Sequence, residues 1–127
     1  MTTSIRAGMC IQIQSARTGD WHPYVVITEP EGNPLEVAVV NFTGYKPNVD
    51  ETAVFDVGDH PYLTKKSMIN YMDGQVVSVD RLELFIEGNP HKVKADCDSK
   101  MLTKIQKGVS TSRATRPKFR EYCEGRC

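Results

Sequence analysis

Residues 24–43, YVVITEPEGNPLEVAVVNFT, decide the fold of this 127-residue chain. Residues 24–28 are rich in β-branched side chains and too few for a helix, and residues 36–43 continue in the same way, so both segments predict strands. Two prolines, a glycine and an asparagine separate them at residues 29–34. So short a turn joins the strands as an antiparallel hairpin, and the chain is therefore predicted to be mainly β.

The segments before the hairpin predict one more strand and a loop. Residues 9–14 alternate, with two isoleucines on one face and two glutamines on the other, as a strand with one wet face requires. Residues 15–23 contain turn formers followed by a proline, which is excluded from a central strand, so they predict a loop.

Short strands are also predicted after the hairpin. Residues 53–57 predict one of them, ahead of a bend that contains a proline. Residues 67–71 and 75–79 predict two more, because Asp73-Gly74 between them is a strong hairpin signal. Residues 81–86 fit a strand, since their leucines and isoleucine alternate, but the run Arg-Leu-Glu-Leu from residue 81 also fits one helical turn.

The end of the chain predicts helices. Apolar residues recur at helical spacing over residues 99–107, with Asp98 or Ser99 as the N-terminal cap and Gly108 as the stop. A second short helix is predicted from Thr115, because a proline lies in its first turn and a glycine follows its last apolar residue. Short strands followed by helices predict a small antiparallel barrel with a helical appendage.

The predicted structure consists of a barrel at residues 1–98 and a basic helical appendage at residues 99–127. The charge of the chain changes sign at nearly the same place. Residues 1–99 hold 8 Lys and Arg against 14 Asp and Glu, whereas residues 100–127 hold 8 against 2, for a net charge of zero. A basic segment of this kind contacts nucleic acid, docks on the acidic body or meets an acidic partner, and the sequence does not choose among these.

Composition narrows the class of protein. With 39% hydrophobic and 25% charged residues, the chain is neither disordered nor collagen-like. It has no apolar run long enough to span a bilayer and no export signal, so we expect a cytoplasmic protein without a membrane partner.

The four cysteines are expected to be reduced thiols. Cys123 and Cys127 are four residues apart, and on a helix that spacing separates their Cβ atoms by about 5–6 Å, beyond the ~3.8 Å usual for a disulfide. The three histidines are scattered, so no metal site is predicted, and no cofactor is expected.

No phosphate loop, dinucleotide fingerprint or nucleophile elbow occurs in the sequence. The candidate functional residues are therefore polar and aromatic side chains in loops and at strand ends. A histidine in a loop can exchange a proton near neutral pH. A hydroxyl at the end of a strand or a pair of lysines can contact phosphate, and a tryptophan in a loop can stack on a base. Each also has a purely structural interpretation. These candidates are Trp21, His22, Thr43, His60, Lys65 and Lys66.

Three stretches together resemble the MazF/PemK-like toxin family. They are HPYVVIT at residues 22–28, VAVVNFT at 37–43 and LTKKSMINYMDGQVVSVDRL at 63–82, and the similarity covers about residues 8–85. The last stretch has a leucine, Ser67 opening a strand, a turn, a second strand and an Arg-Leu pair at the family's spacing. The resemblance implies an SH3-like barrel, endoribonuclease activity, a homodimer and an antitoxin as partner.

By this resemblance, His22 occupies the place of the family's catalytic arginine and Thr43 that of its hydroxyl residue. Cleavage by attack of the 2′-hydroxyl on the neighbouring phosphate needs a base, an acid and positive charge on the phosphate oxygens. His22 is suited to act as base or acid, and Arg17, Lys46 or Lys65 to supply the charge.

The predicted function is that of a toxin-type protein that binds RNA and cleaves it without a metal ion, with His22 and Thr43 catalytic. The predicted substrate-binding residues are Arg17, Trp21, Lys46, His60, Lys65 and Ser67. Two alternatives remain open. The first is a non-catalytic SH3-like module that binds an antitoxin-like protein partner. The second is nucleic-acid binding through the basic C-terminal tail.

Overall fold

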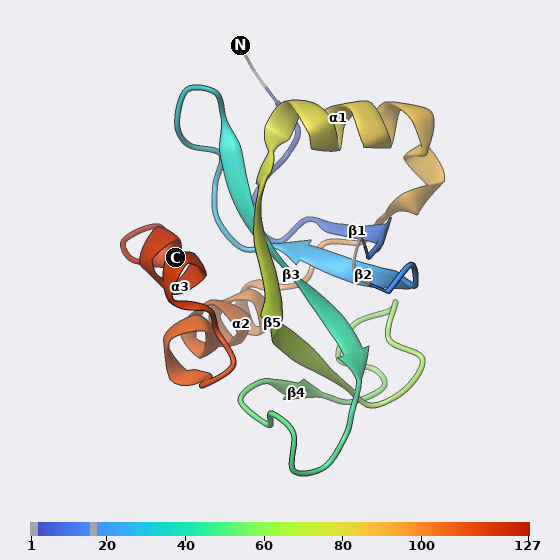
Figure 1. Cartoon of the computed structure of the whole chain (residues 1–127). Coiled ribbons are helices and arrows are strands. Elements are labelled where there is room, and N and C mark those ends of the chain that lie inside the picture. The colour runs from blue at the N-terminus through green and yellow to red at the C-terminus, as the bar shows by residue number, and fades with distance from the viewer. Residues whose placement is uncertain (1–2, 16–17) are drawn as a thin grey trace.

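The computed structural model describes residues 3–15 and 18–127 and shows a curled antiparallel sheet with helices on both faces (Figure 1). The six strands lie in the order β4-β5-β3-β2-β1-β6. The predicted mainly β class is therefore confirmed, and the sheet curls into a half-barrel. The strands are β1 Cys10–Gln14, β2 Trp21–Val26, β3 Glu36–Gly44, β4 Val54–Phe55, β5 Ser67–Ser78 and β6 Val93–Lys94.

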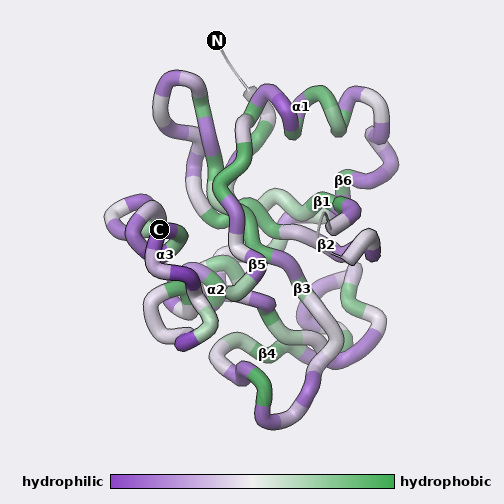
Figure 2. Tube along the Cα trace, in the orientation of Figure 1, coloured by the Kyte–Doolittle hydropathy of each residue, from purple (hydrophilic) through white to green (hydrophobic). Residues whose placement is uncertain are grey.

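Helices interrupt and follow the strands. Helix α1 (Val79–Gly88) and the short 3₁₀ helix η1 (Pro90–Lys92) connect β5 to β6, so the ambiguous segment at residues 81–86 is helical. Helices α2 (Ser99–Thr111) and α3 (Pro117–Cys123) end the chain. Hydrophilic and hydrophobic residues alternate along α1 in Figure 2, as expected of a helix with one buried face.

The two faces of the sheet bury two separate cores. Ala38 and Val40 of β3 pack with α2 and α3 on one face, whereas Val37 and Val39 pack with α1 and the N-terminal segment on the other. A strand that is buried on both faces needs apolar side chains at successive positions, and this explains the run VAVV. The hairpin of β2 and β3, predicted from that run, is confirmed, with Val25 paired to Val40.

Two local predictions about β2 and β4 need correction. Strand β2 begins at Trp21 within the predicted loop, and it includes Pro23. In the described part of the chain β3 pairs with β2 only from Tyr24 onward, so the proline lies where one side of β2 is open and a missing N–H is tolerated. Strand β4 has two residues, fewer than predicted.

The predicted hairpin at Asp73-Gly74 is wrong, because β5 continues through it as one strand. Val39 of β3 pairs with Gln75 and Asn41 pairs with Asn70, so β3 advances two residues while β5 advances five. The Asp-Gly signal therefore marks an irregularity within β5. Glycine is required there because a Cβ at residue 74 would lie 2.6 Å from the ring of Phe119 on α3.

Helix α2 begins where the sequence predicts and ends later. The carboxylate of Asp98 accepts a hydrogen bond from the N–H of Met101 (2.8 Å), which is an N-terminal cap. Gly108 does not stop the helix but lies inside it, against the hydroxyl of Tyr71. The helix ends at Thr111, and the hydroxyl of the next residue, Ser112, donates to the carboxylate of Asp50 (2.5 Å).

Asp50 therefore joins the loop before β4 to the end of α2, and this contact should depend on pH. Although partial burial acts in the opposite direction, hydrogen bonds from Ser112 and Thr52 lower the pKa of the Asp50 carboxyl below its usual 3.8. The stability that it contributes is present above that usual value and is lost as the pH falls through the lowered pKa.

We expect Asp50→Asn to reduce the free energy of unfolding by about 1–2 kcal/mol at pH 6, because hydrogen bonds to a charged acceptor are weakened. Urea unfolding at pH 6 and pH 3 should show the difference from wild type shrinking in acid. Glu121→Gln, at an exposed position of α3, serves as control and should change little at either pH. A difference for Asp50→Asn that stays constant with pH would contradict this prediction.

Candidate nucleic-acid groove

A groove of 640 Å³ opens where β2 begins, β3 ends and the chain runs into β5. Figure 1 shows these three segments on the same side of the sheet. Trp21, at the start of β2, and Lys46, in the turn after β3, lie on this groove together. Six predicted site residues line the groove: Trp21, His22, Thr43, Lys46, Lys65 and Ser67.

The two residues predicted to be catalytic, His22 and Thr43, line the groove from two neighbouring strands. Tyr24 of β2 is paired with Asn41 of β3. The pairing of β2 with β3 ends there, so His22 and Thr43 each lie two residues beyond the last pair, where the groove opens. An imidazole and a hydroxyl that line one groove can engage the same ligand.

Lys65 and Ser67 are positioned by the segment that enters β5. The Lys65 ammonium lies 3.2 Å from the point where a Cβ of Gly44 would be, so it rests over the bare backbone at the end of β3. The hydroxyl of Ser67 donates to the carbonyl of Lys65 (2.9 Å) and thus holds the turn rather than pointing freely into the groove.

Three aromatic side chains of the groove each carry a lysine ammonium on the ring. Lys92 lies 4.2 Å from the ring centroid of Trp21, and Lys66 lies 4.2 Å from that of Tyr45. Lys94 lies 5.4 Å from the centroid of Tyr62. Such cation–π contacts hold lysines beside the groove, where the sequence order alone does not place them.

The groove concentrates positive charge on an acidic body. All five lysines of residues 1–99 line the groove or lie over an aromatic ring that lines it. Among the described residues that form the lining there is no Asp or Glu. Trp21 is 43% exposed and presents a large ring to solvent. This arrangement attracts an anionic ligand that also offers flat rings.

No protein-family model, curated protein or solved structure matches this chain. What the groove does must therefore be argued from its residues. Within residues 3–15 and 18–127, no group of three or more His, Cys, Asp or Glu side chains is placed to hold a metal ion. In the same part of the chain, no helix has the length and apolarity that crossing a membrane requires.

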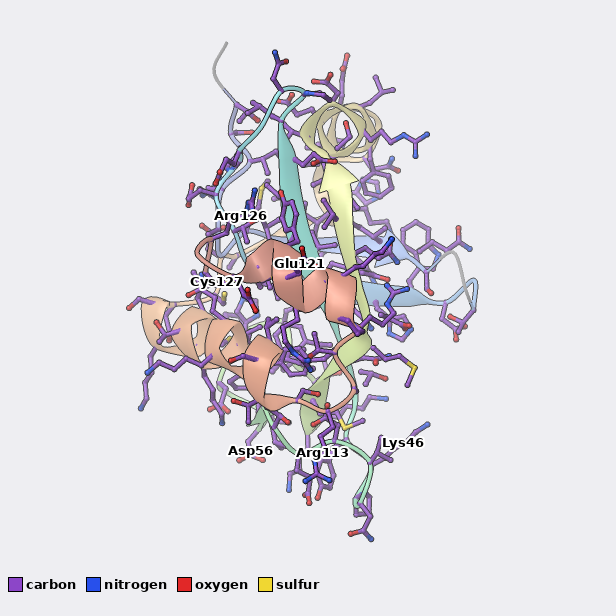
Figure 3. The ribbon with its side chains drawn as sticks, turned by 60° about the vertical axis from the view of Figure 1, so that its left-hand side comes forward. Lys46, Asp56, Arg113, Glu121, Arg126 and Cys127 are labelled. Carbon is purple, nitrogen blue, oxygen red and sulfur yellow. The ribbon has the colours of Figure 1, made fainter. Side chains whose placement is uncertain are left out.

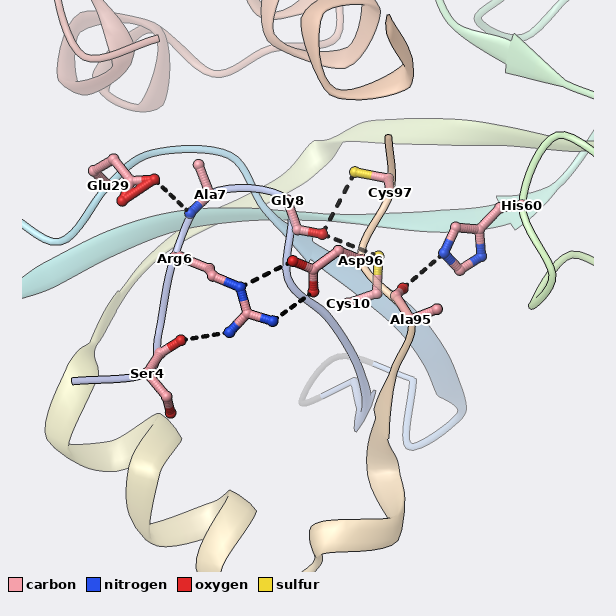
Figure 4. Close-up of polar contacts among 10 residues, drawn as sticks. All are labelled: Ser4, Arg6, Ala7, Gly8, Cys10, Glu29, His60, Ala95, Asp96 and Cys97. Atoms are coloured by element: carbon pink, nitrogen blue, oxygen red, sulfur yellow. Dashed lines mark hydrogen bonds and ion pairs between the residues drawn. The ribbon is translucent and has the colours of Figure 1, made fainter. Parts of the chain in front are cut away.

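His60, predicted to bind substrate, is buried and does not line the groove. Its Nε2 donates to the carbonyl of Ala95 (2.7 Å; Figure 4), and its Nδ1 accepts the N–H of Tyr62 (3.0 Å). Both ring nitrogens are thereby used, and the pattern defines the neutral Nε2–H tautomer. His60 thus ties the bend before β5 to the chain after β6, and the structure does not bring it together with the other predicted site residues in the groove. Arg17 lies outside the described residues.

The basic appendage is largely docked on the rest of the protein. Arg116 donates to the carbonyl of Gly74 (2.6 Å), and Lys104 donates to that of Val54 (3.1 Å). Arg126 forms an ion pair with Glu31 (3.7 Å). Several tail cations thus hold α2 and α3 against the sheet, and this favours docking among the three explanations of the basic segment.

Proposed function

We propose that this protein binds single-stranded RNA in the lysine-lined groove and cleaves it, as a MazF/PemK-like toxin built on an SH3-like barrel. The observation that supports the proposal most strongly is the convergence of all five lysines of residues 1–99 on a groove that also holds His22 and Thr43. Lysines bind phosphates, and exposed aromatic rings stack on unpaired bases.

The chemistry follows from the residue types. His22 removes the proton from a ribose 2′-hydroxyl, whose oxygen then attacks the adjacent phosphate and forms a 2′,3′-cyclic phosphate. The bond to the 5′-oxygen of the next nucleotide breaks, and that oxygen takes up a proton from solvent. Lys65, resting over Gly44, neutralises the charge that grows on the phosphate oxygens. Thr43, which lines the same groove, donates a hydrogen bond to one of those oxygens. The reaction needs the 2′-hydroxyl and no metal ion.

The contribution of charge to binding has a direct test. We expect Lys65→Ala and Lys46→Ala each to weaken binding of labelled single-stranded RNA about three- to tenfold. The logarithm of the binding constant falls linearly with the logarithm of the salt concentration. Each variant should make this line less steep, by about 0.7 for every phosphate that it no longer neutralises. Fluorescence anisotropy over a series of salt concentrations measures both quantities.

Lys100→Ala is the matched control, because Lys100 is an exposed lysine of α2 outside the groove. It should leave affinity and slope unchanged. If Lys100→Ala weakened binding as much as Lys65→Ala, binding would run through the basic appendage and the groove proposal would fail.

A further inference from the structure

A second site lies between α2 and α3, away from the groove. A cavity of 370 Å³ opens there, and both Cys123 and Cys127 line it. Cys123, the last residue of α3, is buried, whereas Cys127 is exposed. Figure 3 shows Cys127 beside the end of α3, next to Arg126.

The chain after α3 brings the two thiols together. The helix ends at Cys123, so the helical spacing that disfavours a disulfide does not apply. Gly125 adopts a φ of +76°, and the N–H groups of Arg126 and Cys127 both donate to the carbonyl of Cys123 (3.0 and 3.1 Å). This tight turn folds Cys127 back over Cys123. The Sγ of Cys127 donates to the carbonyl of Ile27 (3.7 Å), and the neighbouring thiols lower the pKa of Cys127 and raise that of Cys123.

The charges of the cavity favour an anionic reagent. Lys107 of α2 and Arg120 of α3 line it, opposed by one carboxylate, Glu124. The guanidinium of Arg120 donates to the carbonyls of Ser112 and Thr115, but its buried Nε–H has no hydrogen-bond partner among the described residues. An exposed thiol that shares a cavity with two cations and with a second thiol has the arrangement of an attacking and a resolving cysteine.

We propose that Cys127 and Cys123 form a thiol–disulfide exchange site that reacts with small anionic disulfides. The Cys127 thiolate attacks one sulfur of the small disulfide, forms a mixed disulfide and releases one thiol. Cys123 then loses its proton and attacks the Sγ of Cys127, which expels the second thiol. Two protein thiols are oxidised to one disulfide, and one small disulfide is reduced to two thiols.

The test uses the full-length reduced protein with oxidised glutathione as probe, followed by intact mass and peptide mapping. Wild type should lose two hydrogens, and the new bond should map to Cys123–Cys127. Cys123→Ser should stop at the mixed disulfide, with one glutathionyl group on Cys127, and Cys127→Ser should acquire neither product. Cys10 and Cys97 provide an internal control, because both are buried and lie against the carbonyl of Gly8 (Figure 4).

The role of charge is tested with Lys107→Ala. It should slow the reaction with oxidised glutathione at least about threefold and leave the reaction with neutral 2-hydroxyethyl disulfide unchanged. Lys100→Ala, on the same helix outside this cavity, is the control for both reagents. The proposal is overturned if the new disulfide maps to Cys10–Cys97, or if wild type accumulates the mixed disulfide without closing the ring. It is also overturned if Lys107→Ala slows both reagents equally.

Discussion

The His22→Ala variant should cut RNA about 10²–10⁴-fold more slowly than wild type, because it loses the group that takes the proton from the attacking 2′-hydroxyl. His22 lines the groove from the first residues of β2, and Thr43 lines it from the end of β3. The assay follows a labelled single-stranded RNA of mixed sequence in a buffer with a metal chelator. Binding by the variant should change much less than cleavage, since Lys46 and Lys65 remain.

Two controls make this prediction specific. His91→Ala alters an exposed histidine in η1 outside the groove, and its rate should equal that of wild type. An RNA with a single 2′-deoxyribose at the cleavage position should bind normally and remain intact there, because the attacking hydroxyl is missing.

The opposite outcomes are equally informative. Cleavage that persists at the wild-type rate in His22→Ala removes His22 from the mechanism. RNA that binds to wild type but is never cut, even at long times, refutes the enzymatic part of the proposal. In that case the groove would be a binding surface without catalysis.

The local pattern of the sequence predicts most strands of the sheet but not the way in which β5 crosses it. The apolar runs of β2 and β3 are legible because burial on both faces demands them. Asp73-Gly74 has the chemistry of a hairpin, yet the ring of Phe119, far along the chain, occupies the space over Gly74. A long-range contact thus decides how a local turn signal is used.

The candidate site shows the same division. His22 and His60 both occur in the tripeptide His-Pro-Tyr, so local sequence treats them alike. Their surroundings differ: His22 lines the groove, whereas Ala95 and the backbone of Tyr62 use both nitrogens of His60. Tertiary contacts separate a candidate catalytic histidine from a structural one.

The residues that complete the groove from a distance are not predicted by the sequence. They belong to η1, β6 and the turns beside β3 and β5, and cation–π contacts that span tens of residues bring them together. They are Tyr45, Tyr62, Lys92 and Lys94, and the contact of Lys66 with the ring of Tyr45 is not predicted either. The sequence carries a partial signal, because all five lysines of the acidic residues 1–99 line the groove or lie on one of its aromatic rings.

Gly108→Ala should be strongly destabilising, although alanine favours a helix by about 1 kcal/mol over glycine. A Cβ at residue 108 would overlap the hydroxyl oxygen of Tyr71 and lie 2.6 Å from its Cζ. The Tyr71 side chain is fully buried, and its hydroxyl donates to the carbonyl of Ile105 (2.8 Å), so it has no room to turn aside. We expect a loss of about 2–4 kcal/mol in the free energy of unfolding, measured by urea titration.

Gly88→Ala is the matched control, because it also lies in a helix and a Cβ there meets nothing within 4 Å. It should leave stability unchanged or raise it by up to about 1 kcal/mol. In a Tyr71→Phe background the overlap with the hydroxyl disappears while the contact with Cζ remains, so the cost of Gly108→Ala should shrink without vanishing. Equal costs in both backgrounds would contradict this prediction, because they would mean that the Tyr71 hydroxyl does not cause the loss and that α2 shifts as a body to admit the methyl group.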